Sequence, residues 1–474
     1  MKKNFGSIFI YIVLTIFTLI SMYFVYGIYK LNVLKTMYFL IIAILVTIIL
    51  IFAWVKLLRK KTKFITKLII IIISILLSGG YLFAIRYINT TIKFVDNMTS
   101  VKHVTQKYSV LVLKNSSYEK IDDLENKTIG FLKSNVNLDL ATEKLGETID
   151  FNDKKYDDAA TLVSGVYNNN IPAVVLDNAY IEMLEDNDAE FIEDSKVIYT
   201  FEIEVSKKDS KKAVNITKDP FVLYISGSDS RGTVSDIARS DVNIVAVVNP
   251  KNNKILLVSI PRDYYVQLHD TSGAKDKLTH AGIYGIDMSK STIEDLLDID
   301  INYYTKVSFT TVINVVDVID GIDINSDAAF IPHTDHSCEI SLGTQHLDGK
   351  CALAYARERY TYETGDRHRG QNQQEVLTAI IKKVSNPKYL VKYNDILSAI
   401  DGSFATDLSY NDITNLIKYQ LDNLNNWQVE SIGLDGTGSM QPTYSMGNTL
   451  LYVMVPDQST VENAKTRIKE YLEG

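Results

Sequence analysis

The sequence predicts an α/β protein that is tied to a membrane by three helices at its N-terminal end. Two observations lead to this fold class. About the first ninety of the 474 residues are almost entirely apolar. Beyond them, short strand-like runs alternate with stretches of helical periodicity, which is the pattern of an α/β fold. A chain of this length has room for two or three domains.

Three apolar runs are each long enough to cross a bilayer as a helix. They cover roughly residues 7–28, 37–55 and 68–88, and each is near the ~20 residues that a spanning helix needs. No cleavage site with small residues follows the first run, and two more runs come after it, so it is not a signal peptide. We therefore expect a membrane region at residues 1–88.

Basic residues around these runs predict the orientation of a multi-pass protein in the cell membrane. Lys2 and Lys3 precede the first run, and the loop between the first and second runs carries only Lys30 and Lys35. The loop between the second and third is far more basic, with Lys56, Arg59, Lys60, Lys61, Lys63 and Lys67. Since positive charge stays inside, we expect a cytoplasmic N-terminus and extracellular C-terminal domains. A chain with two spans, the alternative, would place the large domain inside.

Residues 89–205 are interpreted as a connector and a small extracellular α/β domain. The polar stretch 89–105 predicts the connector. After it, "YSVLVLK" and "IPAVVLD" are strand-like, and "LDLATEKLG" and "DDAATLVSGVYNN" have helical spacing. The phrase "IDDLENKTIGF" faintly resembles half of a bacterial solute-binding protein. No catalytic constellation is found here, so we expect an accessory module.

A charged linker at 206–220 ends in proline and predicts a boundary, after which the second α/β domain covers 221–474. It opens with the strand "FVLYISGSD". A hairpin buried on both faces follows, formed by "VNIVAVVNP" and "KILLVSIPRD". Strands and helices then alternate, as in "TIEDLLDI", "NYYTKVSF", "TTVINVVDVID" and "GIDINS". We expect one helix in "LDGKCALAYARER", with Asp348 near its start, and a second at 366–384.

The stretch Tyr355–Gln374 holds four arginines and no lysine, although the net charge of the chain is −8. Two of them, Arg357 and Arg359, come from the turn that leads into the helix expected at Asp366. Arg369 and Gln373 then lie on one face of its first turns. The helix N-terminus adds positive charge, and the guanidinium fork suits phosphate oxygens.

This stretch therefore predicts a phosphate or pyrophosphate cradle. On these residues alone, an alternative stays open, in which the arginines form a solvated face paired with Glu358, Glu363 and Asp366.

Carboxylates and arginines also follow or precede the predicted strands. Asp229 and Arg231 come after one strand, and Arg239 and Asp241 come just before another. The hairpin ends in Arg262 and Asp263. Because α/β folds place their sites at strand ends, we expect these side chains to converge. Two carboxylates among arginines suit a hard divalent cation, Mg²⁺ or Mn²⁺.

These motifs together resemble the LytR-CpsA-Psr family of Gram-positive envelope proteins, and most closely its capsule-biosynthesis branch. The resemblance covers about residues 221–384, through "GSDSR…RSDVNIV", "VSIPRDYYVQL", "KLTHAGIYG", "LDGKCALAYARER" and "GDRHRGQNQQ". Two positions depart from the family pattern, which has threonine at Tyr264 and often arginine at Asn372.

The resemblance implies a catalytic domain with a central mixed sheet flanked by helices, which buries a prenyl tail between them. It implies a phosphotransferase that moves a capsular or other cell-wall glycopolymer from a polyprenyl-pyrophosphate carrier to peptidoglycan, leaving a phosphodiester. Asp229 and Asp241 would hold Mg²⁺. The pyrophosphate would be bound by Arg239, Arg262, Arg357, Arg359 and Arg369, supported by Gln373 and, as a weaker prediction from its position, Lys277.

The predicted catalytic residues are Arg262, Asp263, Asp366 and Arg369. Metal and arginines would stabilise the charge that develops as the phosphate leaves. An aspartate near the metal would accept the proton of the attacking hydroxyl. Either Asp263 or Asp366 suits this role, and the sequence does not choose between them.

Three other functions are compatible with parts of the pattern. Water in place of the sugar hydroxyl would make the chain a polyprenyl-pyrophosphate phosphatase. A non-enzymatic protein would bind lipid-linked polymer and regulate capsule assembly with other capsule-assembly proteins. A transcription regulator is opposed by the topology, which leaves only short pieces inside, and the acidic charge opposes nucleic-acid binding.

The cysteines and histidines leave further alternatives. Cys338 and Cys351 form either a disulfide in an oxidising compartment or two free buried thiols. His333, His336 and Cys338 suggest a zinc site, but no second pair follows at finger spacing, which favours a surface loop. His280, in "KLTHAGIYG", is interpreted as a packing or hydrogen-bonding group rather than a catalyst.

Overall fold

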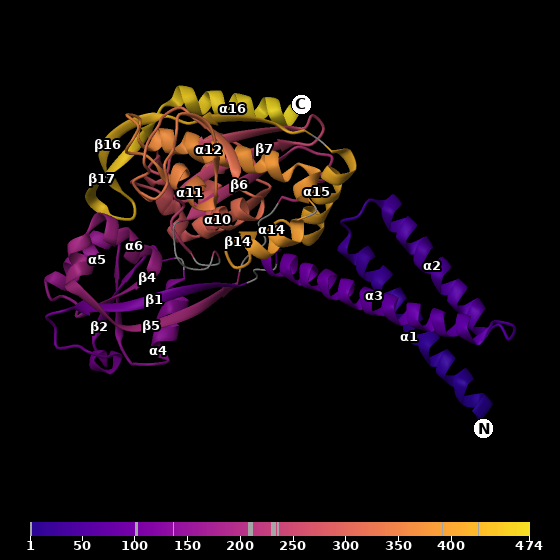
Figure 1. The fold of residues 1–474 in the computed structure, drawn as a ribbon. Coiled ribbons are helices and arrows are strands. Elements are labelled where there is room, and N and C mark those ends of the chain that lie inside the picture. Colours follow the sequence, from indigo (N-terminus) through magenta and orange to yellow (C-terminus); the bar gives the residue numbers. More distant parts are fainter. Residues whose placement is uncertain are drawn as a thin grey trace. The chain divides into compact units, whose positions relative to one another are not determined.

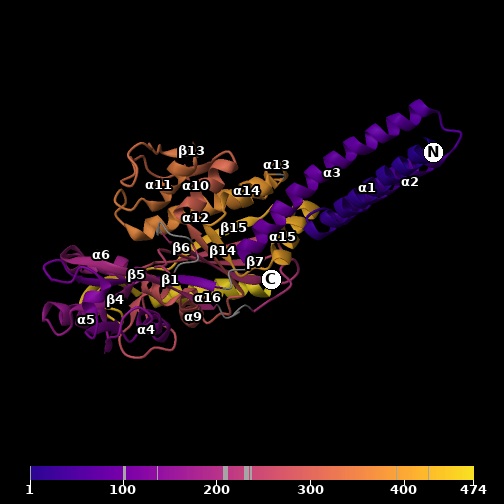
Figure 2. The ribbon, with the colours of Figure 1, turned by 90° about the horizontal axis from the view of Figure 1, so that it is seen from below.

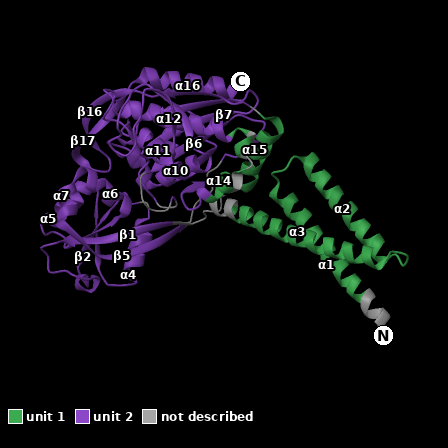
Figure 3. Ribbon diagram, viewed as in Figure 1, with its two compact units in different colours: residues 1–99, 385–398, 408–425 green, residues 100–384, 399–407, 426–474 purple. Residues whose placement is uncertain are grey.

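The computed structural model describes residues 2–474 apart from 100–102, 136, 207–211, 229–233, 235, 236, 391 and 425. Figures 1 and 2 label its helices and strands. The chain divides into two compact units (Figure 3). The first contains residues 1–99, 385–398 and 408–425, and the second contains 100–384, 399–407 and 426–474. Where each domain begins and ends stays a prediction.

The first unit contains the three apolar helices α1 (Lys2–Leu31), α2 (Thr36–Leu58) and α3 (Phe64–Thr99). All three are long and apolar enough to cross a membrane, as predicted. The first part of the connector predicted at 89–105 is helical, because α3 continues to Thr99. The segment 89–99 contains no proline or glycine that would end a helix.

A segment from the second half of the sequence belongs to the same unit. It contains α13 (Pro387–Leu390), most of α14 (Tyr393–Ala399) and α15 (Tyr410–Asn423). The hydroxyl of Tyr410 donates to the carbonyl of Leu31, 3.1 Å away. Lys35 donates to the carbonyl of Asp422 at 3.0 Å. Helix α15 therefore lies against the loop that joins α1 to α2.

The second unit begins with the accessory module, residues 103–206, which has a mixed five-stranded sheet in the order β3-β2-β4-β1-β5. Strand β4 is buried along its whole length, as its uninterrupted apolar run predicts. It pairs antiparallel with β1 and parallel with β2. The elements are β1 (His103–Leu113), η1 (Ile121–Leu124), β2 (Thr128–Leu132), α4 (Leu138–Gly146), β3 (Asn152–Tyr156), α5 (Ala159–Tyr167), β4 (Ala173–Asp177), α6 (Asn178–Asn187), α7 (Ala189–Asp194) and β5 (Ser195–Ser206).

The C-terminal module, which we define as the residues of the second unit after 211, contains a six-stranded sheet in the order β14-β11-β6-β7-β8-β15. The sheet is mixed, as expected, because β6, β7 and β8 are antiparallel while β11 and β15 add in parallel. The predicted hairpin is β7 with β8. The strands are β6 (Phe221–Ser228), β7 (Val242–Asn249), β8 (Lys254–Ile260), β11 (Tyr303–Ser308), β14 (Phe404–Thr406) and β15 (Gln428–Gly433).

Helices cover both faces of this sheet, and Figure 2 shows the sheet between α12 and α16. Successive side chains of a strand point to opposite faces. Val245 and Val247 belong to the core cluster that includes α9 and α16. Ile244 and Ala246 belong to the cluster below α12. The helices are α8 (Leu278–Ala281), η2 (Gly282–Tyr284), α9 (Ile286–Leu297), α10 (Phe309–Val318), α11 (Gly349–Arg357), α12 (Asp366–Val384) and α16 (Gln458–Glu473).

Smaller two-stranded sheets complete the module: β9 (Tyr265–Val266) with β10 (Asp276–Lys277), β12 (Ile322–Ser326) with β13 (Gly343–Leu347), and β16 (Gly436–Thr443) with β17 (Gly447–Pro456). The predicted starts of both arginine-bearing helices are confirmed. Asp348 caps α11 by accepting from the backbone N–H of Cys351, and α12 runs from Asp366 to Val384.

A buried carboxyl in the accessory module makes its stability dependent on pH. Asp177 caps α6 by accepting from the backbone N–H of Tyr180 at 2.9 Å. Burial raises the pKa of Asp177 to about 7, against the lowering effect of that hydrogen bond. The unfolded value is about 3.9. Since the folded chain then holds a proton that the unfolded chain has lost, stability falls as pH rises from about 4 to 7.

We expect Asp177→Asn to remove this slope, because the amide keeps an acceptor but does not ionise. The Tm of the detergent-solubilised variant, relative to the unmodified chain, rises as pH goes from about 4 to 7. Asp139→Asn, at an exposed position, is the control. Its Tm relative to the unmodified chain is expected not to change with pH. Parallel Tm curves for Asp177→Asn and the unmodified chain would show that the folded-state pKa is ordinary.

Candidate functional site

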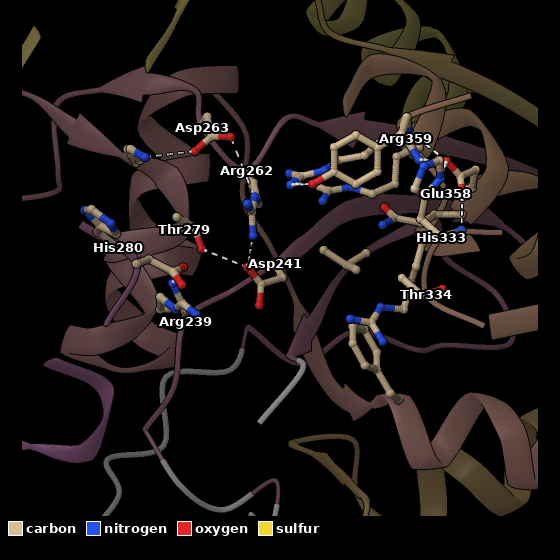
Figure 4. A pocket seen from close by; sticks show the side chains of 18 of the residues that line it. Arg239, Asp241, Arg262, Asp263, Thr279, His280, His333, Thr334, Glu358 and Arg359 are labelled. Carbon is tan, nitrogen blue, oxygen red and sulfur yellow. Dashed lines mark hydrogen bonds and ion pairs between the residues drawn. The ribbon is translucent and has the colours of Figure 1, made fainter. Parts of the chain in front are cut away.

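A cavity of about 500 Å³ lies where the ends of β7, β8, α11 and α12 meet (Figure 4). Most of the predicted site residues line it: Arg239, Asp241, Arg262, Asp263, Lys277, Arg357, Arg359, Arg369 and Gln373. Asp366 instead lines two adjoining cavities. Asp229 and Arg231 lie outside the described residues.

The strand register explains why residues far apart in sequence meet. Asn243 of β7 pairs with Ile260 of β8, so the start of β7 lies beside the end of β8. Asp241 immediately precedes β7, and Arg262 follows β8. Their side chains therefore come together, with the guanidinium Nη1 of Arg262 donating to Oδ1 of Asp241 at 2.9 Å.

Arg262 lies between two carboxylates, as Figure 4 shows. In addition to Asp241, it is paired with Asp263, whose Oδ2 lies 3.6 Å from its Nε. Burial alone would lower the pKa of Arg262, but the charges of Asp241, Asp263 and Asp366 outweigh it and raise the pKa above its usual value. Its guanidinium is thus a permanent, fixed cation.

Asp263 is also held by Lys277, whose Nζ lies 3.3 Å from Oδ1. Burial would raise the pKa of Asp263, but the charges of Lys277 and Arg262 lower it below its usual value. Asp263 is therefore an ionised carboxylate at neutral pH. Its proton affinity is reduced, which makes it a weak base.

Arg369 is almost buried, with a side chain 14% exposed, and its Nη1 lies 3.5 Å from Oδ1 of Asp366. Arg359 approaches the same oxygen at 3.7 Å. Burial lowers the pKa of Arg369, Asp366 opposes this, and the positive charge of Arg262 lowers the pKa further. The partly buried guanidinium groups of Arg262 and Arg369 repel each other, and an anion bound between them would stabilise both.

The alternative of an arginine face paired with acids is right in part. Asp366 pairs with Arg359 and Arg369, and Arg367 turns away to Asp435 at 2.7 Å. Within the described residues, the Glu358 carboxylate forms no ion pair with the side chain of any of these arginines. Its buried carboxylate accepts hydrogen bonds from backbone N–H groups of the turn, those of Arg359, Tyr360 and Thr361, and from the backbone N–H of His333 in another loop. It fixes the turn between α11 and α12.

Some residues of the pocket carried no signal in the sequence. Asp186 and Asn187 of α6 line it, and Asp186 pairs with Arg239. They come from the accessory module, in which no motif was found. Phe309 also lines the pocket, and its ring lies 4.4 Å from the guanidinium of Arg357. An aromatic residue at the start of a helix is too common to have marked it.

Cysteines and histidines near the site have structural partners. Cys338 and Cys351 form a disulfide, so Cys338 is not available to a zinc ion. His333 lies in the predicted loop but also lines the pocket. His280 is buried, with its Nδ1 2.7 Å from Asp276 and 2.9 Å from the hydroxyl of Ser445. These contacts fit the hydrogen-bonding role expected of it.

One carboxylate of the predicted metal pair, Asp241, lies in the pocket, and a phosphate group would have to supply further ligands to a divalent cation there. Oδ1 of Asp241 accepts from Arg262, and Thr279 approaches it at 3.5 Å. Within the described part of the chain, no group of three or more His, Cys, Asp or Glu could hold a metal. Mg²⁺ commonly binds one or two carboxylates together with substrate phosphates. A carboxylate in a cationic pocket suits that pattern.

The chain matches the LytR_cpsA_psr family over residues 193–470. A Bacillus cereus protein named polyisoprenyl-teichoic acid–peptidoglycan teichoic acid transferase TagU is 34% identical over 270 residues, covering 56% of this chain and 84% of that protein. Its namesake from Bacillus mycoides is 32% identical over 313 residues, covering 65% and 92%.

Solved structures are also similar. That of the LytR-CPS2A-psr family protein YwtF (TagT), whose source is Bacillus subtilis, has bound octaprenyl pyrophosphate lipid. It is 29% identical, covers 56% of this chain and 94% of that chain, and has a TM-score of 0.42.

Proposed function

Because this chain belongs to the LytR-CpsA-Psr family, we propose that it transfers a glycopolymer from a polyprenyl-pyrophosphate carrier to peptidoglycan. Relatives that it matches over most of their length are named as teichoic acid transferases acting from a polyisoprenyl carrier. The observation that carries the proposal is the pair Arg262 and Arg369, two partly buried guanidinium groups that line one pocket. The polymer is a capsular or other cell-wall glycan.

The reaction requires charge neutralisation more than covalent chemistry. A hydroxyl oxygen of the acceptor forms a bond to the phosphorus that carries the polymer. The bond from that phosphorus to the bridging oxygen breaks, and polyprenyl phosphate leaves with the electron pair. Arg262, Arg369, Arg357 and Arg359 stabilise the negative charge on the phosphate oxygens as it shifts. Gln373 and Lys277 add contacts to the head group.

The proton of the attacking hydroxyl goes to an aspartate. Of the two candidates, Asp263 has a lowered pKa because Lys277 and Arg262 stabilise its charge. Because Asp263 holds Arg262 and Lys277 in place, we assign the proton to Asp366, which adjoins Arg359 and Arg369.

The proposal includes Mg²⁺, which Asp241 would hold together with Asp229, a residue outside those described. When bound, the ion would supply positive charge to the phosphate oxygens. Asp241 already orients Arg262, so one carboxylate serves both the arginine and the metal.

The surface below α12 suits the prenyl chain of the carrier. Several apolar side chains of the sheet and of α12 are only partly buried there, including Leu223, Ile225, Val242, Leu377 and Ile381. Val242 also lines the cavity of about 500 Å³ that holds the arginines, which we call the arginine pocket. An apolar surface that adjoins a phosphate-binding pocket suits a ligand that has both a phosphate head group and an apolar chain.

The proposed topology places the N-terminus in the cytoplasm and the pocket outside. The basic loop between α2 and α3 supports it. The contacts of Tyr410 and Lys35 support it too, because they hold α15 against the loop between α1 and α2. In the proposed orientation, that loop is extracellular, as α15 must be.

The test uses the full-length chain in vesicles with a polyprenyl-pyrophosphate-linked saccharide and peptidoglycan fragments. We expect a product in which the saccharide is joined to peptidoglycan by a phosphodiester, together with one polyprenyl phosphate released per transfer. Free saccharide phosphate without acceptor would identify a phosphatase instead. Binding of the lipid with neither product would identify a non-enzymatic binder.

A further inference from the structure

The accessory module and the C-terminal module share one hydrophobic core. A single cluster of buried residues contains Leu162 and Met183 of the first together with Tyr284 and Met446 of the second. Across the interface, the hydroxyl of Tyr180 donates to that of Tyr284 at 3.0 Å. Modules with a substantial apolar interface do not move freely against each other. Helix α6, which carries Tyr180 near its start and Met183 and Leu184 closer to its end, therefore has a fixed place.

The C-terminal end of α6 forms part of the wall of the arginine pocket. Asp186 and Asn187, the last residues of α6, line it, and we call them the α6 rim. The guanidinium Nη1 of Arg239 donates to Oδ2 of Asp186. The side chain of Arg239 is 11% exposed and that of Asp186 is 53% exposed. The Asp186 carboxylate thus holds the arginine and still faces open space.

The carboxylate of the α6 rim differs from Asp241 and Asp263 in its exposure: those side chains are 8% and 10% exposed and pair with Arg262, whereas that of Asp186 is 53% exposed. A carboxylate only accepts hydrogen bonds and repels phosphate, whereas an amide both donates and accepts. In Figure 4, Arg359 lies across the pocket from Arg239, which pairs with Asp186. An exposed acid and an amide at the edge of a phosphate pocket suit the hydroxyls of an uncharged sugar. The acid does not suit the pyrophosphate itself, because it repels it.

We propose that the α6 rim binds the sugar joined to the pyrophosphate, so that the accessory module selects which lipid-linked polymer enters the site. The proposal rests on the proposed function, because the arginines must first hold the pyrophosphate. Asp186 and Asn187 then accept and donate hydrogen bonds to hydroxyls of the first sugar. Asp186 also positions Arg239 at the boundary between sugar and phosphate.

The test compares two lipids bound to the full-length chain in detergent. One is undecaprenyl pyrophosphate, and the other is the same lipid carrying one N-acetylhexosamine. The variants are Asp186→Asn and Asn187→Ala. The control is Glu185→Gln, at an exposed position on the same helix. Asn at position 186 still accepts a hydrogen bond from Arg239, so the phosphate side stays intact.

The single carbonyl oxygen of Asn at position 186 stays with Arg239, so no acceptor is left for the sugar, and Asn187→Ala removes the amide. We expect each variant to raise the Kd for the sugar-bearing lipid by about 3- to 10-fold, which corresponds to one lost hydrogen bond. The Kd for the bare lipid stays close to that of the unmodified chain, and Glu185→Gln changes neither. Equal weakening of the binding of both lipids, or an unchanged Kd for the sugar-bearing lipid, would show that the rim does not bind the sugar. Neither result would contradict pyrophosphate binding by the arginine pocket. If the unmodified chain binds neither lipid, the proposed function fails and this proposal fails with it.

Discussion

Replacing Arg369 with alanine is expected to lower kcat for glycopolymer transfer by at least about 100-fold at saturating lipid. Removing one preorganised group that stabilises charge in the transition state typically costs this much. Arg369 is suited to that role because its side chain is 14% exposed and sits beside Arg262 in the pocket. Lysine at this position keeps the charge but loses the two-pronged geometry, so we expect Arg369→Lys to restore little activity.

Arg367→Ala is the matched control, because Arg367 lies on the same helix but pairs with Asp435 in an adjoining cavity and does not line the arginine pocket. We expect its kcat to stay close to that of the unmodified chain. If Arg369→Ala weakens lipid binding but transfers at the normal rate once saturated, Arg369 only binds the substrate. Equal losses in both variants would mean that the effect is one of folding.

Removal of divalent metal is expected to abolish transfer, and added Mg²⁺ to restore it. Asp241→Asn keeps the size of the side chain but removes the charge that we propose for the metal. We expect the Mg²⁺ concentration that gives half-maximal activity to rise by at least about 10-fold in this variant, by analogy with the loss of groups around other metal sites.

Asp241 also holds Arg262 at 2.9 Å, so a lower kcat alone would not identify a metal ligand. The shift in the Mg²⁺ requirement separates the two roles, since a purely positioning role leaves that requirement unchanged. Transfer that proceeds at the normal rate in the presence of a chelator would show that the reaction does not require a divalent metal.

Much of the site could be predicted from the sequence because its residues follow or precede strongly patterned elements. The apolar runs of β7 and β8 predicted the hairpin, and a hairpin necessarily brings Asp241 to Arg262. The helix from Asp366 to Val384 was predicted at both ends. The helical spacing then explains why Arg369 and Gln373 share one pocket.

What could not be predicted depends on contacts between distant segments. Asp186 joins the pocket only because α6 docks on η2 through Tyr180 and Tyr284, and no periodicity encodes a docked surface. Glu358 was read as a partner for arginines, but a buried carboxylate satisfies nearby backbone N–H groups first. Asn372 is buried and donates to the carbonyl of Tyr355, and it does not line the pocket.

An experimental structure of the full-length chain with undecaprenyl pyrophosphate tests the central claim most directly. The account predicts density for both phosphates within hydrogen-bonding distance of Arg262 and Arg369, continuing into an alkyl chain between the sheet and α12. A lipid head group bound elsewhere, with these two arginines in contact with protein alone, would contradict it.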